Sequence, residues 1–265
     1  MAIHEDLAGR TALIAGGATL IGSELARAFV RQGCNVVFAD INVEGGQDAA
    51  IRCGKQGIFV ETDVTNDAAI DACIHSARTA FGGVDFLINV TTSYLDDGLT
   101  TSREDWLKAL DVGLVGGAIL AQKLSEELGE RKGAIVNFSS ISAHRAQAGR
   151  FVYPAIKAAV AQLTRSQALE FASRGVRVNA VTPGWTWSNI MKVISSDDRA
   201  RVDELGGAFH MPGRIADASE LAGAVLFLCS ESAGFVTGSE VAVDGGYLAL
   251  GPERTENPIT ALMKE

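Results

Sequence analysis

Long apolar runs are absent from this sequence of 265 residues. No stretch provides the roughly 18 uncharged apolar residues that a membrane-crossing helix needs. The first residues, Met1 to Asp6, also lack a basic segment followed by an apolar one, which a secretory signal would have. We therefore expect no membrane partner and a cytoplasmic location.

Cysteine and positive charge are also scarce. The 4 cysteines lie far apart and show neither a CxxC pair nor Cys/His ligand spacing, so we expect buried free thiols and no metal site. Lys and Arg number 23 against 32 Asp and Glu, and the resulting net charge of −9 would repel nucleic acid. A small-molecule partner is expected instead.

Proline is rare as well, with 5 residues, and no Pro-, Ser- or charge-rich linker divides the chain. We therefore expect residues 1–265 to form a single domain. Within it, a long connection of mixed polarity at 185–214 is predicted to be a substrate lid. The polar C-terminal tail at 251–265 is predicted to be either disordered or an interface arm.

Short β-branched runs alternate with segments whose apolar residues recur at helical spacing. Seven strands are predicted, at 11–15, 35–40, 57–61, 84–89, 134–139, 176–181 and 240–244. Several of these runs are apolar almost throughout, which is typical of strands covered on both faces. The pattern predicts an α/β fold with a doubly wound, Rossmann-like parallel sheet, whose ligand crevice lies at the carboxyl ends of the strands.

A glycine-rich turn, Gly16 to Gly22, follows the first strand and leads into a helix, where free backbone N–H groups can bind a pyrophosphate. Such turns also close ordinary strand-to-helix corners, so the turn alone indicates little. Asp40 ends the second strand, where a carboxylate accepts hydrogen bonds from ribose and repels a 2′-phosphate. The pair predicts a site for NAD in preference to NADP, with Asp63 near the adenine. A solvated strand end for Asp40, and a turn or helix cap for Asp63, are the alternatives.

Tyr153 and Lys157 are four residues apart and therefore lie on one face of a helix. A tyrosine accepts protons near neutrality only if its pKa falls by about 2–3 pH units from its ordinary value, and a nearby cation lowers it. Lys157 is the expected cation. Ser140 ends the fifth strand at the crevice, where its hydroxyl can bind a substrate oxygen. We predict that these three residues are catalytic, with Tyr153 as the acid/base of a hydride transfer.

Together with 179–184 and 243–246, these motifs resemble the short-chain dehydrogenase/reductase family over residues 7–248. The resemblance implies that Ser140 orients the substrate and that Lys157 also binds the nicotinamide ribose. It further implies a homotetramer or dimer formed through helices at 104–128 and 152–174. The cofactor-binding residues predicted from the turn and the resemblance are Gly16, Thr19, Leu20, Ile21, Asp40, Asp63, Val64, Asn89, Tyr153, Lys157, Pro183, Gly184, Thr186 and Ser188.

Three departures from the family pattern stand out. Leu20 replaces the middle glycine of the turn, Val90 follows Asn89 where the family has a second asparagine, and Gly113 replaces the asparagine of the catalytic tetrad. These changes support an alternative function, a dinucleotide-binding sensor or scaffold with weak or no catalysis.

The resemblance places the aromatic residues Tyr94, Trp185 and Trp187 around the mouth of the substrate site, unless they only pack the lid. Arg145 and Arg150 lie between Ser140 and Tyr153, where a basic side chain binds an anionic substrate group or stays solvated. The leading prediction is an NAD-dependent oxidoreductase that interconverts a secondary alcohol, whether cyclic, sugar-like or aromatic-bearing, and its ketone.

Overall fold

The computed structural model describes residues 4–252, 259, 262 and 263. Within this part of the chain, seven parallel strands form one sheet in the order β3-β2-β1-β4-β5-β6-β7. The strands are β1 (Thr11–Ala15), β2 (Asn35–Asp40), β3 (Gly57–Glu61), β4 (Phe86–Asn89), β5 (Ala134–Phe138), β6 (Arg177–Pro183) and β7 (Glu240–Val243). The order reverses between β1 and β4, which places the ligand crevice of a doubly wound sheet at their carboxyl ends.

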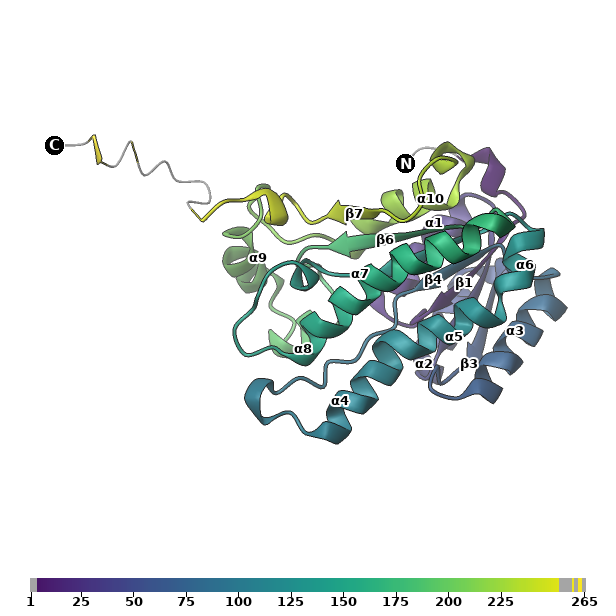
Figure 1. Ribbon diagram of the computed structural model, residues 1–265, viewed down its shortest axis with the longest axis horizontal. Helices are drawn as coiled ribbons and strands as arrows, with labels where there is room; N and C mark the ends of the chain where they lie inside the picture. The colour runs from purple at the N-terminus through teal and green to yellow at the C-terminus, as the bar shows by residue number, and fades with distance from the viewer. Residues whose placement is uncertain (1–3, 253–258, 260–261, 264–265) are drawn as a thin grey trace.

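Helices cover both faces of the sheet (Figure 1). They are α1 (Leu20–Arg31), α2 (Val43–Arg52), α3 (Asp67–Phe81), α4 (Arg103–Leu110), α5 (Gly116–Lys123), α6 (Ser125–Glu130), α7 (Val152–Phe171), α8 (Asn189–Ile194), α9 (Arg199–Gly207) and α10 (Ala222–Cys229). Successive residues of β1 point to opposite faces, so Ile14 packs under α1 and α10 while Leu13 packs under α3, α5 and α7. The predicted fold is confirmed.

The connection at 185–214, predicted to be a substrate lid, contains two helices, α8 and α9, which are short and only partly buried. Side chains hold α9 in place: Arg199 pairs with Asp203 on the same helix at 2.8 Å and with Asp217 outside it at 2.6 Å, and its guanidinium lies 5.4 Å from the Trp187 ring. Tertiary contacts of this kind stabilise helices whose own apolar periodicity is weak.

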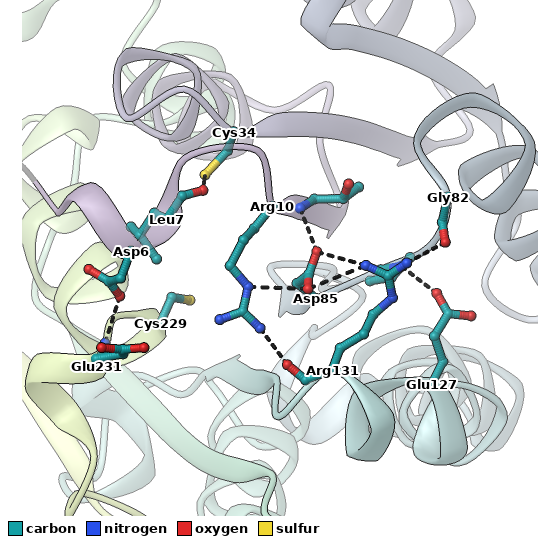
Figure 2. A network of polar contacts seen from close by, with 12 residues as sticks. Asp6, Leu7, Arg10, Cys34, Gly82, Asp85, Glu127, Arg131, Cys229 and Glu231 are labelled. Atoms are coloured by element: carbon teal, nitrogen blue, oxygen red, sulfur yellow. Dashed lines mark hydrogen bonds and ion pairs between the residues drawn. The ribbon is translucent and has the colours of Figure 1, made fainter.

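A polar network holds the amino ends of the central strands, opposite the crevice (Figure 2). Asp85, just before β4, accepts hydrogen bonds from the Thr11 backbone N–H at 2.9 Å and from the Arg10 side chain at 3.1 Å. Arg131, beyond α6, approaches the same carboxylate at 3.4 Å and donates to the Gly82 carbonyl. The network joins β1, β4 and α6 far from any ligand, so its role is structural.

No helix among the described residues is long and apolar enough to cross a membrane. All four cysteines are buried and unpaired. The predicted tail at 251–265 falls largely outside the described residues.

Candidate active site

The glycine-rich turn brings the chain from β1 into α1 with two very close backbone approaches. Gly16 has φ +84°, and a Cβ on Gly22 would lie 2.4 Å from the Gly16 carbonyl oxygen, so a larger residue at position 22 would force the turn open. Thr19 caps α1 by accepting a hydrogen bond from the Gly22 N–H at 3.0 Å. The Leu20 N–H, at the first position of the helix, donates to the Asn189 side chain of the lid at 2.7 Å.

A cavity of about 230 Å³ lies beside this turn, bordered by the ends of β2 and β3. Asp40 borders it and accepts a hydrogen bond from the Ala18 N–H at 3.0 Å. Asp63 also borders the cavity. One of its carboxylate oxygens accepts hydrogen bonds from the backbone N–H and the hydroxyl of Thr65, so Asp63 also forms a turn, which was its alternative predicted role. The lining, with two carboxylates at the strand ends beside the glycine-rich turn, fits the adenosine half of a nicotinamide dinucleotide. Of the predicted cofactor residues, those that border this cavity are Gly16, Thr19, Ile21, Asp40, Asp63, Val64 and Ser188.

Two predicted cofactor residues, Leu20 and Asn89, line neither this cavity nor the substrate cavity. Asn89 instead donates to the Asn137 side chain at 2.9 Å. It borders a separate space of about 20 Å³ beside Gly113, large enough for one water molecule. Gly113 lies in a π-helical turn between α4 and α5, and a Cβ there would lie 3.0 Å from Ile156 Cγ2 on α7. Ile156 therefore approaches the position where the family's asparagine side chain would begin.

The three predicted catalytic residues come together at the carboxyl end of β5. Ser140 follows that strand, and its hydroxyl lies close enough to Tyr153, in the first turn of α7, to lower the pKa of the phenol. Lys157 lies one turn further along, 5.6 Å from the centroid of the Tyr153 ring, and donates to the Phe138 carbonyl at 2.8 Å. Ser140 also contacts Ser142 at 3.3 Å, and Ser142 donates to Gln147 at 2.8 Å. A chain of hydroxyl groups thus leads from the phenol into the loop before α7.

The electrostatics of the site differ from the expectation that Lys157 lowers the pKa of Tyr153. Burial raises the pKa of the Tyr153 phenol, and the Ser140 hydrogen bond and the Arg150 charge only partly offset that rise. Burial also lowers the pKa of Lys157 to about 8. In the free protein desolvation is the largest cause of both shifts, and for Lys157 no carboxylate among the described residues of the cavity wall opposes it.

A second cavity of about 440 Å³ contains this cluster and is the candidate substrate site. It shares Ile21, Val90, Thr92, Tyr94, Ser188 and Ile190 with the adenosine cavity, so the two spaces adjoin. The other predicted residues that border it are Ser140, Arg150, Tyr153, Lys157, Pro183, Gly184, Trp185 and Thr186. Trp187 and Arg145 do not border it. Trp187 packs against Arg199, and Arg145 donates to the carbonyls of His144 and Leu248.

Two functional positions were missed by sequence reasoning. Asp96, in the loop after β4, accepts hydrogen bonds from the N–H groups of Phe151 and Tyr153, both at 2.9 Å, and so caps α7 in place of a local N-cap. Burial opposes its ionisation, but these backbone donors prevail and hold the pKa of Asp96 below its ordinary range.

The second missed position is His210, which is buried behind the lid. It accepts a hydrogen bond from the Trp185 N–H at 3.1 Å, and its other ring nitrogen lies 2.7 Å from the Gly206 carbonyl. A neutral imidazole protonated at Nδ1 satisfies both contacts. Asp96 lies 55 and 57 positions from its partners, and Trp185 lies 25 positions from His210, so no local motif marks these contacts.

The sheet order, the glycine-rich turn and the Ser140/Tyr153/Lys157 cluster define a dinucleotide-binding α/β protein of the dehydrogenase type. A family model described as enoyl-(acyl carrier protein) reductase matches residues 16–248. A cis-4-hydroxycyclohexanecarboxylate dehydrogenase from Sinomonas cyclohexanicum is 36% identical over 254 residues, which cover 93% of this chain and 99% of that protein. A 3-alpha-(or 20-beta)-hydroxysteroid dehydrogenase from Mycobacterium bovis is 34% identical, with coverage of 92% and 91%.

Solved structures agree. One described as a short chain dehydrogenase/reductase family protein has a TM-score of 0.82 at 34% identity and covers 92% of this chain and 99% of its own. A short-chain dehydrogenase/reductase of unknown function from Caenorhabditis elegans, solved with cofactor, has a TM-score of 0.86 at 26% identity, with coverage of 95% and 100%. The chain belongs to the short-chain dehydrogenase/reductase family.

Proposed function

We propose that this single-domain protein is an NAD-dependent dehydrogenase that interconverts a secondary alcohol and its ketone. The observation that carries the proposal is the placement of Ser140, Tyr153 and Lys157 on the wall of one cavity, which adjoins an adenosine-sized one. Among similar proteins, enzymes named for hydroxycyclohexanecarboxylate, sorbitol and hydroxysteroids are all dehydrogenases of hydroxyl-bearing carbons. This range supports an oxidoreductase acting on CH–OH groups.

The residues divide the chemistry between them. Ser140 holds the substrate oxygen while Tyr153 accepts the hydroxyl proton during oxidation and returns it during reduction. Lys157, fixed by the Phe138 carbonyl, places a positive charge beside the phenol that favours its ionised form once the cavity fills. The nicotinamide, when bound, takes or gives the hydride of the alcohol carbon. Trp185, Met191 and Ile194 border the same cavity and exclude water from it.

NAD is the proposed cofactor in preference to NADP. The carboxylate of Asp40 borders the adenosine cavity, where it accepts ribose hydroxyl hydrogen bonds and repels a 2′-phosphate. The residues that would hold the rest of the dinucleotide are the glycine-rich turn, for the pyrophosphate, and Pro183 to Ser188, beside the nicotinamide. An Asp40→Ser variant should therefore gain NADP affinity relative to NAD.

The substrate is proposed to be a cyclic, sugar-like or aromatic-bearing alcohol. The cavity wall carries the rings of Tyr94, Trp185, Phe209 and Tyr247, which favour a compact apolar body. The dehydrogenases named above act on six-membered rings, on a sugar alcohol and on steroids, so the panel for a first screen should contain one alcohol of each kind.

The test combines turnover with binding. Wild-type protein should reduce NAD with at least one panel alcohol, and Tyr153→Phe should lower kcat by at least about 10²-fold while still binding NAD in calorimetric titration. Undiminished turnover in the variant would contradict the assignment of Tyr153 as the acid/base.

The alternative of a sensor or scaffold rests on Leu20, Val90 and Gly113. Leu20 borders neither cavity, so its side chain does not occupy the cofactor space. NAD binding with no turnover on any alcohol would nevertheless favour the sensor.

We also propose that the protein forms a dimer or tetramer and is located in the cytoplasm. Leu107 on α4, Val115 before α5 and Leu169 on α7 are exposed apolar side chains, 61%, 43% and 81% accessible, on the helices expected to form a dimer or tetramer. Four unpaired cysteines fit the reducing cytoplasm. Light scattering of the purified protein measures the assembly directly.

A further inference from the structure

One arginine in the wall of the substrate cavity has an uncompensated charge. Arg150 borders the cavity, and its side chain makes no hydrogen bond or ion pair with a described residue. Among the described residues lining this cavity there is no Asp or Glu, while Lys157 adds a second cation. The cavity is thus a positive site within a chain whose net charge is −9.

Three other arginines of the described chain, Arg31, Arg103 and Arg201, also have no side-chain partner, but they are exposed on the surface, whereas Arg150 is half-buried and borders a cavity. Arg145, five residues earlier in the same loop, donates to two backbone carbonyls at 2.9 and 3.1 Å. Arg214 pairs with Glu220 at 2.7 Å, and Arg199 with two aspartates. The planar fork of a guanidinium matches the two oxygens of a carboxylate, so a free fork facing a cavity is a ready site for one.

The position of Arg150 suits a group on the same small molecule that reacts at Tyr153. Its guanidinium carbon lies 5.6 Å from the centroid of the Tyr153 ring. The nearby wall is apolar, with Ile141, Met191 and Phe209. A substrate that contacts both residues therefore has a hydroxyl at one end, an apolar body, and an anionic group at the other.

We propose that Arg150 binds a substrate carboxylate, and that the alcohol oxidised here is a hydroxycarboxylic acid. The proposal rests on the proposed function and assigns its substrate class. Arg150 then selects the substrate by charge, while Ser140 and Tyr153 act on the hydroxyl.

The experiment compares 4-hydroxycyclohexanecarboxylate with its carboxamide, which keeps the shape and removes the charge. Wild-type protein with NAD should prefer the carboxylate. Arg150→Gln should lower kcat/KM for the carboxylate by about 30-fold, which corresponds to the loss of one charge-assisted hydrogen bond. The same variant should lower kcat/KM for the carboxamide far less. Arg150→Lys should restore part of the loss because it keeps the charge without the fork. Arg145→Gln, in the same loop but outside the cavity, is the matched control and should keep the wild-type preference.

Two results would overturn the proposal. One is the absence of any preference for the carboxylate in wild-type protein. The other is an equal loss on both compounds in Arg150→Gln with an alkaline shift of the pH profile, because Arg150 would then act only on the ionisation of Tyr153.

Binding of cyclohexanecarboxylate, which has no hydroxyl to oxidise, separates this proposal from the function itself. Calorimetry should detect its binding to the NAD complex of wild-type protein and a loss of at least about tenfold in affinity in Arg150→Gln. If it binds in this way while no alcohol turns over, the proposed activity fails and the carboxylate site stands. If it does not bind, the carboxylate site is wrong.

Discussion

Lys157 is a cation held in a place that disfavours charge. Its side chain is 3% exposed, and burial lowers its pKa to about 8 from 10.5. A difference of this size corresponds to about 3 kcal/mol that the folded protein gives up at neutral pH. The folded protein is therefore less stable because a charged Lys157 is kept at this buried position.

We predict that Lys157→Met stabilises the free protein and abolishes turnover. The desolvation cost of about 3 kcal/mol disappears, while the lost charge-assisted hydrogen bond to the Phe138 carbonyl costs about 2 kcal/mol, which leaves a gain of about 1 kcal/mol at pH 7. Urea denaturation measures it. Lys123→Met, which removes an exposed lysine paired with Asp71, is the control and should not stabilise.

The pH dependence of this gain has a definite sign. The native pKa of Lys157, about 8, lies below the unfolded value of 10.5, so between these pH values the unfolded chain binds more protons than the folded one. Wild-type stability therefore rises relative to Lys157→Met from about pH 8 to 10.5, and the two should converge. A gap that stayed constant across this window would contradict burial as the cause.

At the scale of the element, α7 depends on a residue from another segment. Its own N-cap position, Phe151, provides no side-chain hydrogen bond, and Asp96 from the loop after β4 binds the first N–H groups instead. Since Tyr153 lies in this first turn, the cap also fixes the reacting phenol. Asp96 is a positioning residue.

We predict that Asp96→Ala lowers stability by about 1–2 kcal/mol and kcat/KM by about tenfold, because the first turn of α7 frays around Tyr153. Asp96→Asn, which keeps one acceptor, should lose less of both. The adjacent Asp97→Ala is the control, since the Asp97 carboxylate bonds no described residue. A fall in stability with kcat/KM unchanged would mean that the cap serves the fold alone.

Most strands, but not every element, could be predicted from the sequence. The first three strands were predicted with the observed bounds, since each is a short β-branched run between turn residues. The fourth begins at Phe86 and not at 84, because Asp85 is used for the polar network. The helices α8 and α9 were not predicted, because both are short and α9 is held by contacts such as Arg199–Asp217 that reach outside the helix.

The candidate site was likewise predictable from the sequence only in part. The Ser140/Tyr153/Lys157 cluster could be predicted, because Ser140 ends a predicted strand and Tyr153 and Lys157 are one helical turn apart. The predicted role of Asn89 depended on backbone geometry after β4, and Asn89 instead joins Asn137 in the interior. Asp96 acts across 57 positions of the chain on Tyr153, a separation at which sequence alone carries no spacing rule.

At the scale of the whole molecule, stability and chemistry occupy opposite ends of the sheet. The network around Asp85 lies at the amino ends of the strands, whereas both cavities lie at the carboxyl ends. A change at one end should therefore leave the other intact.

We predict that Asp85→Asn lowers the free energy of unfolding by about 2–3 kcal/mol, since two arginines lose a buried counter-charge, while kcat at 25 °C is unchanged. Thermal denaturation and steady-state kinetics on one preparation check both. Asp6→Asn, which alters a more exposed hydrogen bond to the Glu231 N–H, should cost less. A large fall in kcat would show that the two ends are coupled.

We also predict that Asn189→Ala binds NAD about fivefold more tightly. In the free protein the Asn189 side chain accepts a hydrogen bond from the Leu20 N–H, at the helix start that a pyrophosphate would use, and a bond of this kind is worth about 1 kcal/mol. Calorimetry measures the affinity, with Lys192→Ala on the same helix as control. Weaker binding would show that Asn189 contacts the cofactor itself.

The Asn189 contact has a kinetic consequence. The protein's own side chain acts as an intramolecular competitor of the dinucleotide, and it belongs to the helix that also supplies Met191 and Ile194 to the substrate cavity. We expect the dinucleotide to displace this contact, so that the helix takes its position beside the alcohol only after the dinucleotide is bound. Steady-state turnover should then follow a compulsory order, with the coenzyme first on and last off.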